Sequence, residues 1–121
     1  MATHNAQIVD IDASETITAG QFVKYASGGL DACDAAGEAA DGVAFNDADA
    51  GDPCGTQIGG IVKVKVGSNA VLDGALLTPD ANGLADTAGA GDYVRCKALS
   101  PGAPGAFIPA LWFDGYVFDG T

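Results

Sequence analysis

The sequence predicts an all-β protein: a small β-sandwich or barrel-like domain built from two related β-units. Short apolar runs recur about every 8–12 residues, with Gly-, Pro- or Asp-rich turn signals between them, which is typical of such folds. No segment sustains apolar residues at the i, i+3, i+4, i+7 spacing of an amphipathic helix. A chain of 121 residues fits one domain.

A faint internal repeat relates segment 18–58 to segment 72–112 at a constant offset. Each copy has a turn glycine, an apolar pair, a second glycine-led turn, an Ala-rich loop, a short strand and a last turn glycine. The matched glycines are Gly20 with Gly74, Gly29 with Gly83, and Gly51 with Gly105. Because glycine is favoured where φ is positive, matched glycines predict matched bends. Two copies are too few for a solenoid, so we expect them to share one core.

The first half begins with a predicted flexible arm, residues 1–12, whose end at 7–12 alternates weakly and fits either a strand or extended chain. The strands expected after it are 17–25 (interrupted by a turn at 19–20), 30–33 and 43–45. The Ser-Gly-Gly sequence at 27–29 predicts a hairpin between the first two of these. An acidic loop follows at 46–55, where we expect Pro53 to end any strand pairing.

The clearest strand is expected at 57–66, where Val62, Val64 and Val66 alternate with Lys63 and Lys65. This alternation predicts one buried face and one solvated face, as in an antiparallel sheet. The remaining expected strands are 76–78, 93–99 and 107–113, followed by a short aromatic tail at 116–118.

Composition limits the kind of protein this can be. Ile, Leu, Val and Phe make up only 27 of the 121 residues, so a subunit partner would help to bury apolar area. The net charge of −11 repels nucleic acid. No apolar run is long enough for a membrane helix. The N-terminus lacks the basic and apolar regions of a signal peptide, so we expect a cytoplasmic site of synthesis.

Catalytic and metal-binding patterns are weak. The chain has one histidine, His4, in the expected arm, and its three cysteines form no C-x-x-C pair, so we expect no enzyme activity, no metal site and no cofactor. The cysteines are expected to be free, partly buried thiols, although one disulfide is an alternative. The acidic loop 46–52 spaces carboxylates in a way that suits a hard cation but departs from an EF-hand; the other interpretation is a plain solvated loop.

Two groups of side chains are candidate contact surfaces. The first holds four of the five basic residues, on two expected strands: Lys63, Lys65, Arg95 and Lys97. They are either the solvated face of a sheet or a docking surface for an acidic partner or subunit. The second is aromatic: Trp112, Phe113, Tyr116 and Phe118. Such clusters are enriched in interfaces, but this one is equally interpretable as a lid over the core.

Five short motifs in order resemble those of the capsid cement, or head decoration, proteins of tailed bacteriophages. They are Thr18–Lys24 (TAGQFVK), Asp41–Phe45 (DGVAF), Gly59–Val66 (GGIVKVKV), Asp73–Leu77 (DGALL) and Gly91–Leu99 (GDYVRCKAL). The resemblance covers roughly residues 15–112. The three cysteines and the aromatic residues beyond 112 depart from the family pattern.

The resemblance implies a structural virion protein on the outer surface of an expanded capsid, made in the host cytoplasm. There it would bind the major capsid protein, often as a homotrimer, and stabilise the shell against internal DNA pressure. It also implies that residues 13–121 form a single decoration domain and that residues 1–12 are the capsid-binding arm, through Gln7, Ile8, Val9 and Ile11, which suit addition to a sheet edge.

Two other functions stay open from the residues alone. Trp112, Tyr116 and the Asp-rich loops suit a virion-surface module that binds a glycan or a receptor. A small enzyme ranks last, because no acid–base pair stands out.

Overall fold

The computed structural model describes residues 7–26 and 28–120. They form ten strands and no helix. The first five are β1 (Gln7–Asp12), β2 (Phe22–Ala26), β3 (Gly29–Ala32), β4 (Gly42–Ala44) and β5 (Pro53–Gly59). The other five are β6 (Ile61–Lys65), β7 (Leu76–Pro79), β8 (Ala85–Thr87), β9 (Tyr93–Ala98) and β10 (Phe107–Val117). We call residues 7–59 unit 1 and residues 61–117 unit 2.

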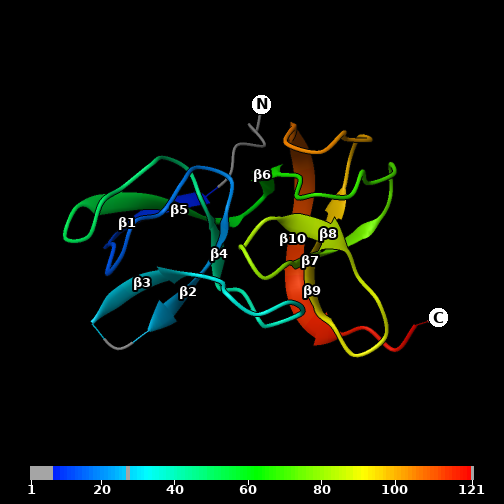
Figure 1. Ribbon diagram of the computed structural model, residues 1–121, viewed down its shortest axis with the longest axis horizontal. Coiled ribbons are helices and arrows are strands. Elements are labelled where there is room, and N and C mark those ends of the chain that lie inside the picture. The colour runs from blue at the N-terminus through cyan, green and yellow to red at the C-terminus, as the bar shows by residue number, and fades with distance from the viewer. Residues whose placement is uncertain (1–6, 27, 121) are drawn as a thin grey trace.

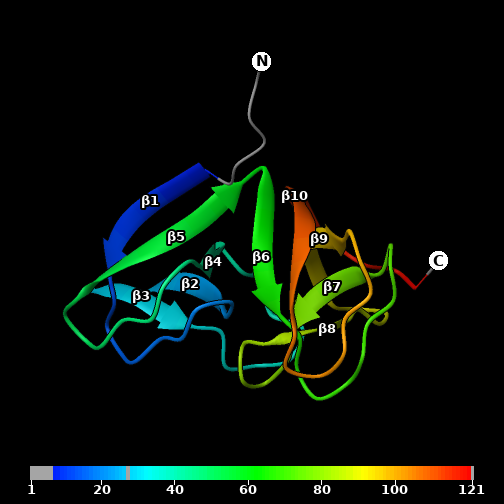
Figure 2. The same cartoon turned by 90° about the horizontal axis from the view of Figure 1, so that it is seen from above.

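The two units have the same sheet topology. Unit 1 forms a five-stranded sheet in the order β1-β5-β4-β2-β3, and unit 2 forms one in the order β6-β10-β9-β7-β8. Adding five to each strand number converts the first order into the second. Figure 1 shows the sheets side by side along the long axis of the molecule, and Figure 2 shows β6 where they meet. The all-β prediction, with two related units, is confirmed.

Strand register repeats along with strand order. The pair Phe22–Val43 between β2 and β4 becomes Leu76–Lys97 between β7 and β9, at the offset that aligns the repeat in the sequence. Backbone hydrogen bonds repeat too: the N–H of Gly20 donates to the C=O of Ala44, and that of Gly74 to Ala98. Gly20 and Gly74 have φ values of 89° and 83°, which a side chain tolerates poorly. The predicted repeat is therefore a duplication of structure.

The duplication also includes the first strand of each unit, which the sequence comparison did not reach. Asp10 pairs with Gly55 in unit 1, and Lys63 pairs with Pro109 in unit 2. Gly55 and Pro109 are themselves matched by the offset of the repeat, so Asp10 is the structural equivalent of Lys63. By this register β1 and β6 are equivalent strands, with an offset shorter by a single position.

Two expectations about strand boundaries are wrong. The strand expected at 57–66 is two strands in different sheets, because Gly60 has a φ of 74° and turns the chain from β5 into β6. Pro53 does not end the ladder: it begins β5 and pairs with Asp12 of the edge strand β1. Proline is tolerated at the first residue of a strand, where its missing N–H breaks no ladder bond.

Apolar side chains bury themselves in two clusters. The smaller one belongs to unit 1 alone and contains Ala13, Ile17, Val23, Leu30, Ala44, Ala48 and Cys54. The larger one, the shared core, joins four residues of unit 1 to the interior of unit 2. Its unit 1 members are Phe22, Cys33, Ala40 and Val43. Its unit 2 members include Val62, Val64, Leu77, Cys96, Ile108 and Trp112.

All three cysteines are free and buried. This agrees with the expectation of free thiols and leaves out the alternative of one disulfide. Burial raises the pKa of the Cys33 and Cys96 thiols to about 12 and also raises that of Cys54. A nucleophilic cysteine needs the opposite shift, so these thiols are core side chains. Within the described residues no helix is long and apolar enough to cross a membrane.

Candidate functional site

The exposed face of β6, β10 and β9 carries several apolar side chains. Alternation along β10 buries Ile108, Ala110 and Trp112 and turns the residues between them outward. We call the exposed set the outer face of unit 2: Ile61, Lys63, Lys97, Leu99, Phe107, Pro109 and Leu111. Five of these seven are apolar, on a sheet side that is normally polar.

Strand pairing places these side chains in rows. Leu111 of β10 lies opposite Ile61 of β6 on one side and Lys97 of β9 on the other. Pro109 lies opposite Lys63. Sequence analysis found the lysines but missed their apolar neighbours. The available signal was the uninterrupted apolar run 107–113, in which a solvated strand face would have polar residues.

The four basic residues gather only in part. Lys63 and Lys97 are exposed on the outer face, on opposite sides of β10. The Nζ of Lys65 lies 5.8 Å from the centroid of the Phe107 ring. Arg95 is half-buried, with its guanidinium 4.7 Å from the centroid of the Trp112 ring.

Arg95 ties the two units together. Its Nη1 donates to the carbonyl oxygen of Ala40 in unit 1 at 3.2 Å, and its Nε donates to that of Phe113 at 3.4 Å. The four predicted interface cations therefore divide in two. Lys63 and Lys97 are exposed and form no ion pair among the described residues, while Lys65 and Arg95 are engaged within the chain.

The aromatic cluster also divides. Trp112 is buried in the shared core, and its Nε1 has no hydrogen-bond partner among the described residues. Phe113 stacks on Tyr116 with ring centroids 5.9 Å apart. Tyr116 is exposed and Phe118 is half-buried. Trp112 is thus a core residue, and Tyr116 is the aromatic side chain of this cluster that reaches solvent.

The predicted arm overlaps a strand. Gln7, Ile8 and Val9 are exposed on β1, and half-buried Ile11 packs against the unit 1 core. β1 pairs with β5 and forms one edge of its sheet. Residues 1–6, including His4, lie outside the described residues.

A groove runs where the units meet. It has a volume of about 240 Å³ and is lined by Ala19, Gly20, Ala44, Phe45, Gln57, Lys63 and Phe107. Gln57, one of these lining residues, is buried. The Gln57 Oε1 accepts from the N–H of Lys63 at 2.9 Å, and its Nε2 donates to the Lys63 carbonyl oxygen at 3.3 Å.

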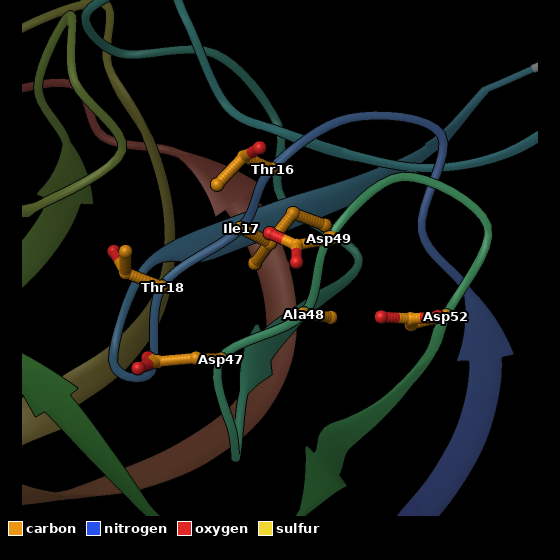
Figure 3. Close-up of a pocket in the computed structure, with 7 residues that line it drawn as sticks. All are labelled: Thr16, Ile17, Thr18, Asp47, Ala48, Asp49 and Asp52. Atoms are coloured by element: carbon orange, nitrogen blue, oxygen red, sulfur yellow. The ribbon is translucent and has the colours of Figure 1, made fainter.

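The acidic loop lines a second hollow, shown in Figure 3. The carboxylates of Asp47, Asp49 and Asp52 lie apart from one another there. Asp47 accepts from the N–H of Ala19 at 2.8 Å, a bond that fixes the loop against the preceding turn. No three His, Cys, Asp or Glu side chains in the described part of the chain are grouped to hold a metal ion.

Acid–base chemistry finds little support in the titrating groups. The ammonium group of Lys24 lowers the pKa of the exposed Asp34 carboxyl through a hydrogen bond at 3.1 Å. A general acid needs a raised pKa in a cleft. The arrangement at Asp34 is that of a surface ion pair.

Comparisons with known proteins identify a family and a similar fold. Residues 2–108 match the family described as phage cement protein. The fold is similar to that of the head fiber gp8.5 N base in bacteriophage phi29, with a TM-score of 0.72 and 19% identity over 88% of this chain and 94% of that one. No curated protein matches the sequence significantly. Because the family match spans most of the sequence, the chain belongs to the phage cement protein family.

Proposed function

We propose that this protein binds the outer surface of an expanded phage capsid and stabilises the shell against internal DNA pressure. Membership of the cement family over residues 2–108 carries the proposal and makes the protein a structural component of a phage capsid. The major capsid protein is the proposed partner, and the bound form is a homotrimer. The thin apolar composition and the exposed outer face of unit 2 support a form with partners.

The mechanism is stabilisation by selective binding. A ligand that binds only the expanded shell stabilises that state by RT ln(1 + [L]/Kd) per site, about 2.7 kcal/mol when free protein is at 100 times Kd. Many sites on one capsid add these contributions. The acidic charge of −11 limits adhesion to the packaged DNA and to other virions.

The contact with the shell is proposed to use the arm, residues 1–12. Its described part supports this role, because Gln7, Ile8 and Val9 are exposed on an edge strand. Apolar side chains on an exposed edge are normally avoided unless a partner covers them.

The test is co-sedimentation with emptied capsids in the expanded and unexpanded forms. Saturable binding to expanded capsids alone, with a rise in capsid melting temperature, is the expected result. Ile8→Asp should weaken binding about tenfold or more, because it places a charge in an apolar contact. The matched control is Leu72→Asp, at another exposed apolar site, in unit 2. Equal binding to both capsid forms, or to neither, would refute the proposal, and the second result would direct attention to glycan binding.

A further inference from the structure

The groove where the two units meet has a mostly apolar lining with a single charged residue. Its apolar and glycine positions are Ala19, Gly20, Ala44, Phe45 and Phe107. The other two lining residues are the buried Gln57 and the exposed Lys63. The chain has a net charge of −11, yet this lining contains a lysine and no carboxylate. Such a surface is complementary to an apolar group that carries negative charge beside it.

Two exposed phenylalanines line this groove, one from each unit. Phe45 of unit 1 is 58% exposed, and Phe107 of unit 2 is 49% exposed. Aromatic side chains that fill or line pockets are frequent energetic centres of protein contacts. The groove therefore has the composition of an interface anchor site.

Contacts within the chain fix the groove in place. A Cβ on Gly20 would lie 2.8 Å from Cε2 of Phe107 and from Cβ of Lys65, so the absence of a side chain lets the Phe107 ring pack against unit 1. The Gln57 amide donates to the carbonyl oxygens of Ala44 and Lys63, at 3.3 Å each, and so joins the two units beside the ring. A preformed groove lowers the ordering cost of binding.

The apolar surface continues from the groove to Ile8 of β1. Ile8 lies directly opposite Gln57 of β5, and residues directly opposite in an antiparallel pair share one face of the sheet. A Cβ on Gly55 would lie 3.3 Å from Cβ of Phe45 and 3.4 Å from Cγ2 of Ile8. Ile8 and Phe45 are thus neighbours over this glycine, and the groove adjoins the part of β1 that is proposed to contact the shell.

We propose that the groove binds an apolar side chain of the major capsid protein, on an exposed segment whose neighbouring carboxylate pairs with Lys63. The inference rests on the proposed function for the identity of the partner, and it adds a second contact beside that of the arm. Size supports a side chain as the occupant. The volume of about 240 Å³ is below the roughly 300–1,000 Å³ of pockets that hold drug-sized ligands, and single side chains anchor many protein interfaces.

The two parts of the occupant have different effects. The apolar side chain supplies affinity, because it covers Phe45 and Phe107. The carboxylate supplies specificity. Covering the groove removes water from Lys63, so a purely apolar segment would leave an unpaired ammonium group in the contact, which costs free energy. The groove therefore discriminates against apolar segments that lack an acidic residue.

The test is co-sedimentation of the purified full chain with emptied, expanded capsids. Phe45→Ala and Lys63→Glu should each weaken binding about tenfold or more, and Lys63→Arg, which keeps the charge, should retain most of it. Ala19→Leu puts a larger side chain at a half-buried lining position and should also weaken binding. Phe45 and Lys63 are exposed, so their variants should keep the wild-type melting temperature.

The matched controls are Tyr25→Ala and Lys97→Glu. Tyr25 is an aromatic residue of unit 1 that is 64% exposed, and Lys97 is an exposed lysine without an ion pair among the described residues. Neither of them lines the groove. Both controls should bind capsids as the wild type does.

The outcomes separate this inference from the proposed function. Wild-type binding combined with normal binding by Phe45→Ala, Lys63→Glu and Ala19→Leu would overturn the groove contact alone. Losses of the same size in the two controls would also overturn it, because they would not be specific to the groove. A wild type that binds no expanded capsid would refute both proposals. Sedimentation velocity without capsids tests another occupant: if the groove variants dissociate an oligomer of the wild-type chain, the groove holds a second copy and the proposal is wrong.

Discussion

Unit 1 and unit 2 share strand order and register, but they bury their apolar side chains differently. Unit 1 has a small apolar cluster of its own, and its Phe22, Cys33, Ala40 and Val43 pack into the shared core with unit 2. The equivalent strand faces of unit 2 do not pack against unit 1. The comparison teaches that two copies of a duplicated scaffold can keep the same backbone while one copy buries a strand face that the other leaves exposed. The variants below change equivalent positions in pairs, in order of decreasing effect.

The largest difference is expected between Val62→Asp and Val9→Asp. Val62 is 1% exposed, so its replacement would bury an unpaired carboxylate and lower the free energy of unfolding by about 4 kcal/mol or more. Val9→Asp should cost less than about 1 kcal/mol. Urea unfolding of dilute protein measures both values. Similar losses at both sites would mean that β1 is as well covered as β6, which contradicts the division between the units.

Phe22→Ala and Leu76→Ala form the next pair. Phe22 fills the shared core, and its truncation should cost about 3–5 kcal/mol through lost transfer energy and a cavity. Leu76 is half-buried, so its truncation should cost less than half as much. Thermal unfolding followed by circular dichroism compares them. A larger loss for Leu76→Ala would show that the Leu76 side chain is already covered in the isolated chain.

The sequence predicted the parts of this comparison that depend on local backbone chemistry. The turn glycines Gly20 and Gly74 indicated the duplication. A backbone position with positive φ favours glycine in both copies of the repeat. The structural equivalence of β1 and β6 could not be recognised from the sequence, because the equivalent residues differ in type. Asp10, for example, has the opposite charge to its equivalent Lys63. The break of the strand at Gly60 was missed because the apolar alternation continues across it, and only the sheet that each half joins shows the difference.

The sequence indicated which kinds of side chain are candidates for contact more readily than it indicated whether each side chain is exposed or buried. The chemistry of Lys63 and Lys97 fits either a docking surface or the solvated face of a sheet, and both side chains are exposed, as either interpretation requires. For Trp112 the composition left core and interface equally open, and burial decided for the core. The exposure of Leu111 could not be predicted, because it depends on which face of the second sheet unit 1 covers. Alternation along a single strand does not indicate which of its two faces is covered.

A third pair tests the polar connection between the units. Gln57→Leu removes the partners of the Lys63 backbone N–H and carbonyl groups, and it should cost about 1–3 kcal/mol because a buried polar group is left unsatisfied. The reverse change at the equivalent site, Leu111→Gln, should stay within about 0.5 kcal/mol, since that side chain is 44% exposed. Hydrogen exchange at the Lys63 amide gives a local reading. Unchanged protection there in Gln57→Leu would contradict the role of the amide.

The smallest difference is expected between the polar interactions made at two equivalent positions, Lys24 in unit 1 and Thr78 in unit 2. In unit 1 the Lys24 ammonium group bonds Glu38 at 3.0 Å and Asp34 at 3.1 Å. At the equivalent position in unit 2, the Thr78 hydroxyl donates to the carbonyl oxygen of Tyr93 at 2.9 Å. Thr78→Val should therefore cost about 1 kcal/mol at any pH or salt concentration, whereas Lys24→Met should cost less and only where the ions are charged.

The pH range of the Lys24 contribution follows from the direction of the two shifts. Hydrogen bonds to Glu38 and Asp34 raise the pKa of Lys24 above its usual 10.5, so its contribution is complete below pH 10.5 and is lost only as the pH rises further. Lys24 lowers the pKa of Asp34 below its usual 3.8, so that part is present above pH 3.8 and is lost as the pH falls. Melting temperatures of Lys24→Met and wild type should thus converge at both extremes, and also at high salt. A gap between them that stays constant across pH and salt would show that the Lys24 side chain acts through packing, as Thr78 acts through a neutral hydrogen bond.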